Sequence, residues 1–256
     1  EPRAVGNWAI RKVAYTAGAG RKFLYPPALL QAGAKMYVAL GSGDREHPLN
    51  SHYPLTTPVL NRFYVYLDDL SAAANAIVTP INLDSDTRMQ NYSASSAQTC
   101  GTGSVTPNSG LKGWFMDLTG DSSSSPRPGE QTVTSALIAA GMVAFNTNRA
   151  LTGSVNSCVN PLGEARGYWV NLLNASGAIG TGSATCGGDR SSIFVGGGLM
   201  PSPTMATVVI DGKTETVAIG AAQRSGGASS GIAPQAVKPA ISSKRRAIYW
   251  KSNAAD

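Results

Sequence analysis

The stretch Met36-Tyr37-Val38-Ala39-Leu40 is a strand pattern that runs directly into Gly41-Ser42-Gly43-Asp44-Arg45-Glu46-His47-Pro48-Leu49. The apolar run is rich in residues that favour strands, and it stops at two glycines. Glycine allows backbone angles with positive φ, and Pro48 ends regular structure, so the sequence predicts a shaped loop after a strand. Such a loop could hold a ligand, or it could fasten one strand to its neighbour.

The composition of the 256-residue chain is typical of a protein built from strands and turns. Only 14% of its residues are charged, against about 25% in an average domain, and 29 are glycine. The net charge of +6 is scattered except for Lys244-Arg245-Arg246, which is too small a cluster to predict nucleic-acid binding. No apolar run reaches the ~18 residues of a membrane span. The longest, Val133 to Phe145, is predicted to form two buried strands that meet at a glycine turn.

Short apolar or alternating runs recur along the chain, each ended by Gly, Pro, Asn or Ser. A short run of alanines, Ser71 to Ile77, is the only predicted helix. Strands without intervening helices indicate an antiparallel all-β fold, arranged as a sandwich or as propeller blades. Three segments are predicted as loops: 91–112, 120–128 and 220–239. The predicted strands are 22–25, 36–40, 62–67, 113–118, 131–137, 142–146, 168–173, 192–195, 205–210, 216–219 and 247–251.

The chain has three cysteines, an odd number. Cys158 and Cys186 lie in loops on either side of the predicted strand 168–173, and we predict a disulfide between them. In the chain-entropy description such a bridge stabilises the fold by roughly 3 kcal/mol. Cys100 would then be free or paired with a residue outside this chain. No spacing of Cys and His predicts a zinc site.

The polar residues of the opening loop, Asp44, Arg45, Glu46 and His47, are the candidate binding residues. Together with His52, the acidic residues and His47 could converge on a metal ion. The alternative interpretation pairs Arg45 with Asp44 or another carboxylate and leaves the histidines in solvent. We favour this alternative and predict no metal site.

Three other motifs that could indicate catalysis or phosphate binding favour structural roles. Gly227 to Gly231 matches Gly-x-Ser-x-Gly, but both histidines precede it, which excludes the chain order of α/β-hydrolases. Glu164 and Arg166 point to one face of a strand and are predicted to form an ion pair. The Gly196-Gly197-Gly198 run is followed by Pro201-Ser202-Pro203, which cannot begin the helix of a phosphate site. We expect close strand packing there, followed by a crossover between sheets.

Four large aromatic residues are predicted to be core residues: Trp114, Tyr168, Trp169 and Trp250. A carbohydrate-stacking platform is the alternative, because exposed aromatic rings beside Asn and Asp suit sugars.

Several motifs, taken together in their order, make the chain resemble the C-terminal domain of PilY-type proteins. These proteins are the tip-associated adhesins and biogenesis factors of type IV pili. The matching stretches span most of residues 21–220 and are 41–49, 61–64, 112–118, 128–134, 143–148, Cys158 with 162–168, and 194–203.

The resemblance implies an all-β fold whose antiparallel sheets are blades of a partial, modified β-propeller with long loops. It implies that residues 1–256 are the later part of the C-terminal propeller region of a larger protein, with 220–239 as a flexible loop within it. The implied function is non-catalytic: a tip-associated protein that supports pilus biogenesis, surface adhesion and twitching motility. It would be exported through the periplasm to the pilus tip or cell surface. Its partners would be minor pilins or the tip complex, and a host or abiotic surface ligand.

The sequence departs from the family in one respect, since it lacks the Asp-x-Asp-x-Asp-Gly calcium loop. Asp84-Ser85-Asp86 is only a fragment of such a loop, and we expect ordinary loop carboxylates there. We therefore expect no cofactor in this segment, and calcium only elsewhere in the full-length protein. Two other functions stay open: a periplasmic quinoprotein-like propeller enzyme and a carbohydrate-binding module.

Overall fold

The computed structural model describes residues 10–17, 20–46, 59–71, 79–93, 100, 103–119, 129–150, 163–181, 185–194, 197–210, 212–220 and 235–237. These residues form fifteen strands and no helix, so the predicted all-β class is confirmed. Within them, no helix of the length and apolar character of a membrane span occurs. The predicted helix at Ser71 to Ile77 lies, apart from Ser71, outside the described residues.

The first large sheet contains the predicted strand 36–40, which lies within β3. Its strand order is β2-β3-β4-β7-β6, and only the β6–β7 pair is parallel. The pairing of β3 with β4 ends where Gly41 lies opposite Phe63, so Gly41 marks the point at which the chain leaves the sheet. The strands are β2 (Ala28–Ala32), β3 (Lys35–Gly41), β4 (Arg62–Asp69), β6 (Met89–Asn91) and β7 (Gly113–Asp117).

The second large sheet has the order β12-β11-β10-β8, and β9 pairs with the first part of β10. All eight residues of β10 are buried, as expected of a strand covered on both faces. Ala140 and Gly141 join β9 to β10 with φ values of 50° and 82°, as a tight hairpin turn requires. The predicted pair of strands meeting at a glycine turn is therefore confirmed, but only β10 is buried throughout, since Leu137 and Ile138 of β9 are partly exposed. The strands are β8 (Glu130–Thr132), β9 (Leu137–Ala139), β10 (Met142–Arg149), β11 (Glu164–Asn171) and β12 (Ser191–Ile193).

Two smaller sheets complete the described structure. One has the order β13-β14-β15, formed by β13 (Thr204–Ile210), β14 (Lys213–Ile219) and β15 (Gln235–Ala236). The other is a parallel pair of β1 (Ala14–Tyr15) with β5 (Ile81–Asn82). Since β15 lies within 220–239, the prediction of one continuous loop there is wrong at this strand.

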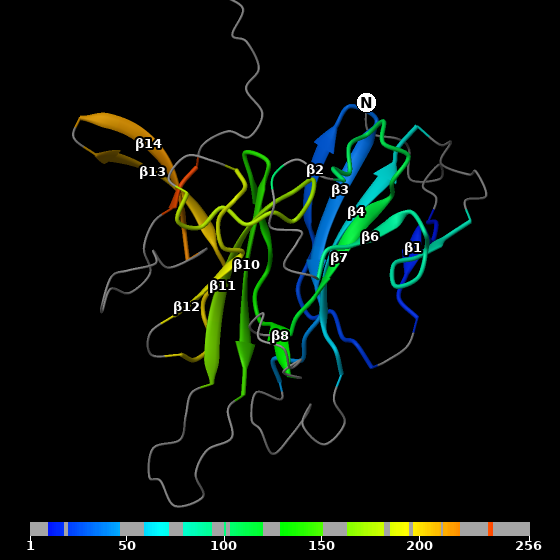
Figure 1. Ribbon diagram of the computed structural model, residues 1–256, viewed down its shortest axis with the longest axis horizontal. Coiled ribbons are helices and arrows are strands. Elements are labelled where there is room, and N and C mark those ends of the chain that lie inside the picture. Colours follow the sequence, from blue (N-terminus) through cyan, green and yellow to red (C-terminus); the bar gives the residue numbers. More distant parts are fainter. Residues whose placement is uncertain are drawn as a thin grey trace, which may run out of the picture.

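The sheets are stacked face to face, from the β1–β5 pair through the two large sheets to β13–β15 (Figure 1). Successive residues of a strand point to opposite faces, so each strand serves two interfaces. On β4, Phe63 packs toward the second sheet, where its ring stacks on Phe145 with centroids 3.7 Å apart. The next residue, Tyr64, packs toward Ile81 of β5. Sheets stacked in this way are the blades of a propeller-like fold, as predicted.

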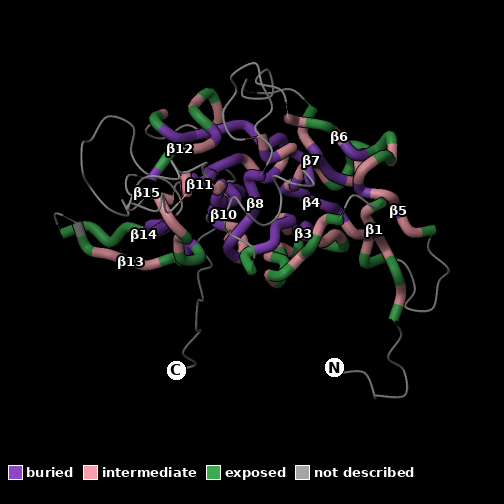
Figure 2. The backbone as a smooth tube through the Cα atoms, turned by 90° about the horizontal axis from the view of Figure 1, so that it is seen from below, coloured by how far each residue is buried: buried purple, intermediate pink, exposed green. Residues whose placement is uncertain are grey.

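The buried residues gather along the middle of the molecule, over β4, β7, β8, β10 and β11 (Figure 2). The β13–β14 hairpin projects from one end and carries exposed residues on most of its length. The centre of the fold is therefore the interface between the two large sheets, and the candidate site lies on it.

Some strand predictions are wrong. Residues 22–25 form no strand, and residues 131–137 divide into β8 and the start of β9 with a bend between them. β2 is not among the predicted strands, because its Ala-Leu-Leu-Gln-Ala sequence consists of residues that favour a helix. The predicted strand 247–251 lies outside the described residues.

Candidate functional site

The loop that follows β3 crosses from the first large sheet to the second. A side chain at either glycine would collide with β8: a Cβ at Gly41 would lie 2.2 Å from Thr132 Oγ1, and one at Gly43 would lie 2.2 Å from the Thr132 carbonyl oxygen. Only glycine permits an approach this close, which is to the side chain of Thr132 at Gly41 and to its backbone at Gly43. The two glycines of the opening motif therefore let the loop lie directly against the second sheet.

Backbone hydrogen bonds fasten this loop on both sides. The Ser42 amide donates to the carbonyl of Arg62 in β4 at 2.8 Å, and the Ser42 carbonyl accepts from the Thr132 amide of β8 at 3.0 Å. The Asp44 amide donates to Gln131 Oε1 at 2.7 Å. We call residues 41–44 with 131–132 the inter-sheet clamp. The opening loop could hold a ligand or fasten one strand to its neighbour. Its first four residues do the latter, because they fasten β8 to the ends of β3 and β4.

Asp44, the first of the four candidate binding residues, is only 1% exposed. Its Oδ2 accepts from Lys22 Nζ at 2.5 Å. Arg45 is exposed and donates instead to the hydroxyl of Tyr25 at 2.9 Å, so the prediction that Arg45 pairs with a carboxylate is wrong. Lys22 and Tyr25 are the first and last residues of the predicted strand 22–25, a segment that forms no strand and whose side chains bind Asp44 and Arg45.

The other candidate residues of the loop do not converge with Asp44 in the described structure. Glu46 is exposed, and His47 and His52 lie outside the described residues. Among the residues described, no three of the types His, Cys, Asp and Glu come together in an arrangement that could hold a metal ion. Lys22 already neutralises the Asp44 carboxylate.

A second polar group lies beside the clamp, on the face of the second sheet that meets the first. Glu130 is 1% exposed, and its Oε1 accepts from Thr147 Oγ1 at 2.6 Å and from the Tyr168 hydroxyl at 2.7 Å. Burial raises the pKa of the Tyr168 phenol well above its ordinary value, and the charge of Glu130 raises it further. The phenol therefore stays protonated and remains a donor to Glu130. Asn61 Nδ2 of the first sheet donates to the Glu130 carbonyl at 3.1 Å, which ties this group to the opposite sheet.

The predicted pair of Glu164 with Arg166 is confirmed, with 2.8 Å between Glu164 Oε1 and Arg166 Nε. Arg149 joins it, since its Nη2 lies 3.0 Å from Glu164 Oε2. Burial acts to raise the pKa of the Glu164 carboxyl, but the hydrogen bonds and charges of Arg166 and Arg149 outweigh it and lower that pKa below its ordinary value. Glu164 is consequently a stable anion between two cations.

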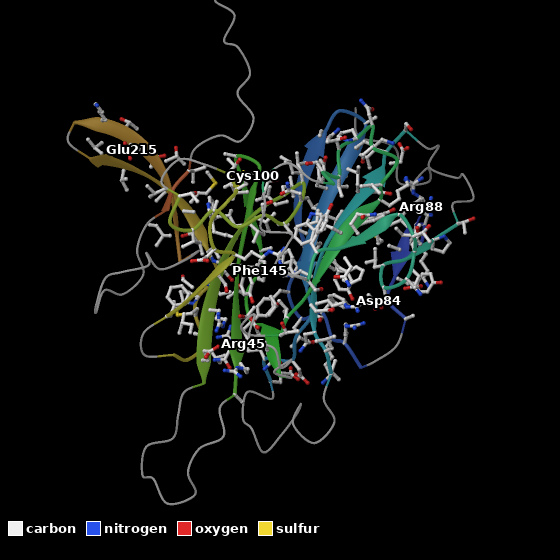
Figure 3. The ribbon with its side chains drawn as sticks, in the orientation of Figure 1. Arg45, Asp84, Arg88, Cys100, Phe145 and Glu215 are labelled. Carbon is white, nitrogen blue, oxygen red and sulfur yellow. A yellow bond between two sulfur atoms is a disulfide. The ribbon has the colours of Figure 1, made fainter. Side chains whose placement is uncertain are left out.

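The acidic residues of the incomplete calcium motif form ion pairs with arginines. Asp84 Oδ1 accepts from Arg62 Nη1 at 2.8 Å, from Arg21 Nη1 at 3.1 Å and from the Tyr64 hydroxyl at 2.6 Å, and Figure 3 shows it on the side of the first sheet away from the clamp. Asp86 pairs with Arg88 at 2.7 Å. These are ion pairs of ordinary loop carboxylates, as predicted.

The large aromatic residues are core residues where the structure describes them. Trp114, Tyr168 and Trp169 are buried, and Trp114 Nε1 donates to the Leu172 carbonyl at 2.7 Å. None of the three is exposed as a sugar-stacking platform. Trp250 and the Gly227–Gly231 motif lie outside the described residues. The segment 197–203 joins β12 of the second sheet to β13 of the next, which confirms the predicted crossover.

The disulfide joins Cys100 to Cys186, so the predicted bridge from Cys158 to Cys186 is wrong. Cys100 precedes β7 in the first sheet and Cys186 precedes β12 in the second, and their Cα atoms are 5.2 Å apart. The stacking of the two sheets brings these loops together across 86 residues of sequence. Cys158 lies outside the described residues.

Sequence reasoning missed Glu130 and Tyr168 as a buried pair. Both are in segments that the resemblance matched, but only the register of β8, β10 and β11 shows that they share a face. The arrangement as a whole supplies ion pairs, hydrogen-bonded carboxylates and backbone hydrogen bonds between the sheets, with Glu130 Oε2 left without a hydrogen-bond partner. Chemically, it holds the two sheets in fixed register.

The fold was compared with known proteins. No protein-family model matches the chain, and no curated protein matches it either. Among solved structures, the C-terminal domain of PilY1 from Pseudomonas aeruginosa matches with a TM-score of 0.56 at 13% sequence identity. The match covers 92% of this chain and 48% of that chain, so this chain spans about half of the PilY1 domain. The resemblance predicted from sequence motifs is thus confirmed for the fold: this chain is similar in structure to the C-terminal domain of PilY1.

Proposed function

We propose that this chain is a non-catalytic part of a pilus-associated protein at the tip of type IV pili. It supports pilus biogenesis, surface adhesion and twitching motility. The similarity of its fold to the PilY1 C-terminal domain over 92% of the chain carries the proposal. The ordered motifs from 41–49 to 194–203 support it independently of the structure.

The disulfide supports the export that this function needs. Disulfides persist in the bacterial periplasm and at cell surfaces and are rare in the cytosol. A bridge between Cys100 and Cys186, which joins two separate sheets, therefore fits a protein that folds in the periplasm and works outside the cell.

In this proposal the function is binding, and the stacked sheets are the rigid support for it. The clamp fastens the first large sheet to the second, and the ion pairs of Glu164 join β10 to β11 within the second sheet. Loops at the ends of the strands would present the surface that contacts minor pilins, the tip complex, or a host or abiotic ligand. The support needs no metal or cofactor of its own.

A gene deletion in the organism of origin tests the proposal. We expect the deletion strain to lose surface pili or twitching motility and to attach poorly, and the wild-type gene in trans to restore all three. Surface pili are counted by electron microscopy, twitching by colony spreading and attachment by crystal-violet staining. A deletion strain with normal pili, motility and attachment contradicts the proposal.

The absence of catalysis is tested separately, on purified protein. A quinoprotein-like enzyme binds a quinone and acquires its visible absorbance, so we expect no such absorbance after incubation with pyrroloquinoline quinone and calcium. A stoichiometric quinone spectrum with dye-linked alcohol oxidation overturns the non-catalytic assignment and leaves the fold untouched.

A further inference from the structure

β13 is the edge strand of the three-stranded sheet, and its outer edge has no partner strand among the residues that the structure describes. Its inner edge pairs with β14 along the whole strand, from Thr204 to Ile210. The β13–β14 hairpin projects from one end of the molecule, so another chain can approach the outer edge (Figures 1 and 2). Such an edge presents backbone N–H and C=O groups to which a further strand can be added.

The register of the hairpin fixes which backbone groups of β13 point outward. Ile210 faces Lys213 across a two-residue turn, and a pair in this position exchanges both of its hydrogen bonds. Hydrogen-bonded and non-hydrogen-bonded pairs alternate along an antiparallel ladder, so every second residue back to Thr204 directs its backbone groups toward β14. The residues between them direct their N–H and C=O groups to the free edge: Met205, Thr207 and Val209.

The side chains of the same three residues are exposed. Met205 is 47% exposed and Val209 is 70% exposed, and Thr207 lies between them on the same face of the strand. The free backbone groups and two exposed apolar side chains therefore belong to one continuous surface, which we call the β13 edge.

The β13 edge lacks the protection that the other sheet edges of the described structure have. β13 has seven residues, whereas β6, β8 and β12 have three each and β15 has two. β2 has five residues and is preceded by Pro26 and Pro27. Short strands, prolines and charged side chains are the usual means by which proteins prevent strand addition. The sequence of β13, Thr-Met-Ala-Thr-Val-Val-Ile, contains neither a proline nor a charge.

We propose that the β13 edge pairs with the β13 edge of a second copy of this chain, antiparallel about a two-fold axis at Thr207. In this register Met205 of one copy faces Val209 of the other, and the two Thr207 residues face each other. These are the residues whose backbone groups point outward, so each facing pair exchanges both of its hydrogen bonds. The exposed Met205 and Val209 side chains cover each other on one face of the joined sheet.

The self-matching sequence of the strand favours a second copy over another occupant. A two-fold axis at Thr207 brings apolar against apolar and threonine against threonine, and it places no charge of β13 opposite its own copy. Pairing uses the outer edge of β13 in both copies, so the assembly closes at the dimer and does not extend into a fibre. One pair of edge strands buries little surface, as is typical of a weak association that depends on concentration.

Sedimentation equilibrium of the 256-residue chain tests the proposal. We expect a reversible monomer–dimer equilibrium whose Kd lies between about 1 μM and about 1 mM. A chain that stays monomeric throughout this range overturns the proposal.

Thr207→Pro assigns the dimer to the β13 edge. It removes an N–H that points outward, and proline is tolerated in an edge strand at such a position, so the bonds to β14 remain. We expect the Kd of Thr207→Pro to rise about tenfold or more, because the two hydrogen bonds between the facing Thr207 residues are lost. Thr207→Val is the matched control, since it keeps the N–H and the branched side chain and should dimerise as the wild type does. A Thr207→Pro chain that dimerises as tightly as Thr207→Val contradicts the assignment.

A pair of charge variants keeps the test decisive should Thr207→Pro fail to fold. Thr207→Lys and Thr207→Glu each place like charges opposite one another in their own dimers, so each should dimerise several-fold more weakly than the wild type. An equimolar mixture pairs opposite charges across the axis and should dimerise more tightly than either variant alone. A mixture that associates no more tightly than the separate variants overturns the two-fold pairing at Thr207.

Discussion

Replacing Gly43 by alanine tests whether the inter-sheet clamp holds the fold together. The added Cβ would lie 2.2 Å from the Thr132 carbonyl oxygen and 2.8 Å from its amide nitrogen. These are backbone atoms and cannot rotate away, so the loop must move off β8. The movement breaks the bond from the Thr132 amide to the Ser42 carbonyl and the bond from the Asp44 amide to Gln131.

The expected loss in the free energy of unfolding follows from the breakage of these two hydrogen bonds. A buried donor or acceptor left without a partner costs about 1–3 kcal/mol, so the loss of both bonds lowers the free energy of unfolding by roughly 2–6 kcal/mol. Gly33→Ala is the matched control, because a Cβ there meets nothing within 4 Å. Its φ of +62° alone accounts for a cost of about 1–2 kcal/mol.

Urea unfolding, followed by tryptophan fluorescence, measures both variants. Trp114 and Trp169 are buried in the two large sheets and report their separation. We expect the midpoint of Gly43→Ala to fall well below that of Gly33→Ala at an unchanged slope. If the two variants have free energies of unfolding within about 0.5 kcal/mol of each other, the clamp does not stabilise the sheets.

Three further predictions concern the clamp, the disulfide and acid stability. Gly41→Ala should destabilise the chain because its Cβ meets the side chain of Thr132, and Thr132→Gly in the same chain should recover part of the loss; a double-mutant cycle with no coupling contradicts this. The double variant Cys100→Ser/Cys186→Ser should lose about 4.5 kcal/mol, from a loop with a sequence separation of 86, and reductant should lower the urea midpoint of the wild type but not of the variant. The pKa of the Glu164 carboxyl is lower in the folded state than in the unfolded state. The ionised carboxylate therefore stabilises the fold at any pH above its unfolded pKa, and this stabilisation is lost as the pH falls through the folded pKa. Between about pH 5 and about pH 2, the urea midpoint should fall less in Glu164→Gln than in the wild type.

Strands with dense apolar sequence could be predicted from that sequence alone. β3, β4, β7 and β10 are runs of aromatic and β-branched residues, and pairing only adjusted their ends. β2 could not be predicted, because its local preference is helical and the pairing with β3 overrides it. The predicted strand 22–25 has the right composition, but Pro26 and Pro27 follow it.

The site was harder to predict, because its partners come from distant segments. The glycines of the opening loop were expected to allow positive φ, whereas in the structure neither Gly41 nor Gly43 has one and both lie against Thr132, a contact that nothing near them in sequence indicates. The pairs of Asp44 with Lys22 and of Cys186 with Cys100 could not be predicted for the same reason, because each partner comes from a distant segment. The Glu164–Arg166 pair was predictable because both residues lie on one strand, two positions apart.

The disulfide and the clamp lie at opposite ends of the interface between the two large sheets. Figure 3 shows Cys100 near one end of the strands and Arg45, beside the clamp, near the other. Sheets joined at one end alone open like a hinge, one contact at a time. Joined at both ends, they resist peeling from either side, and a pulling force must slide whole rows of side chains past each other in shear.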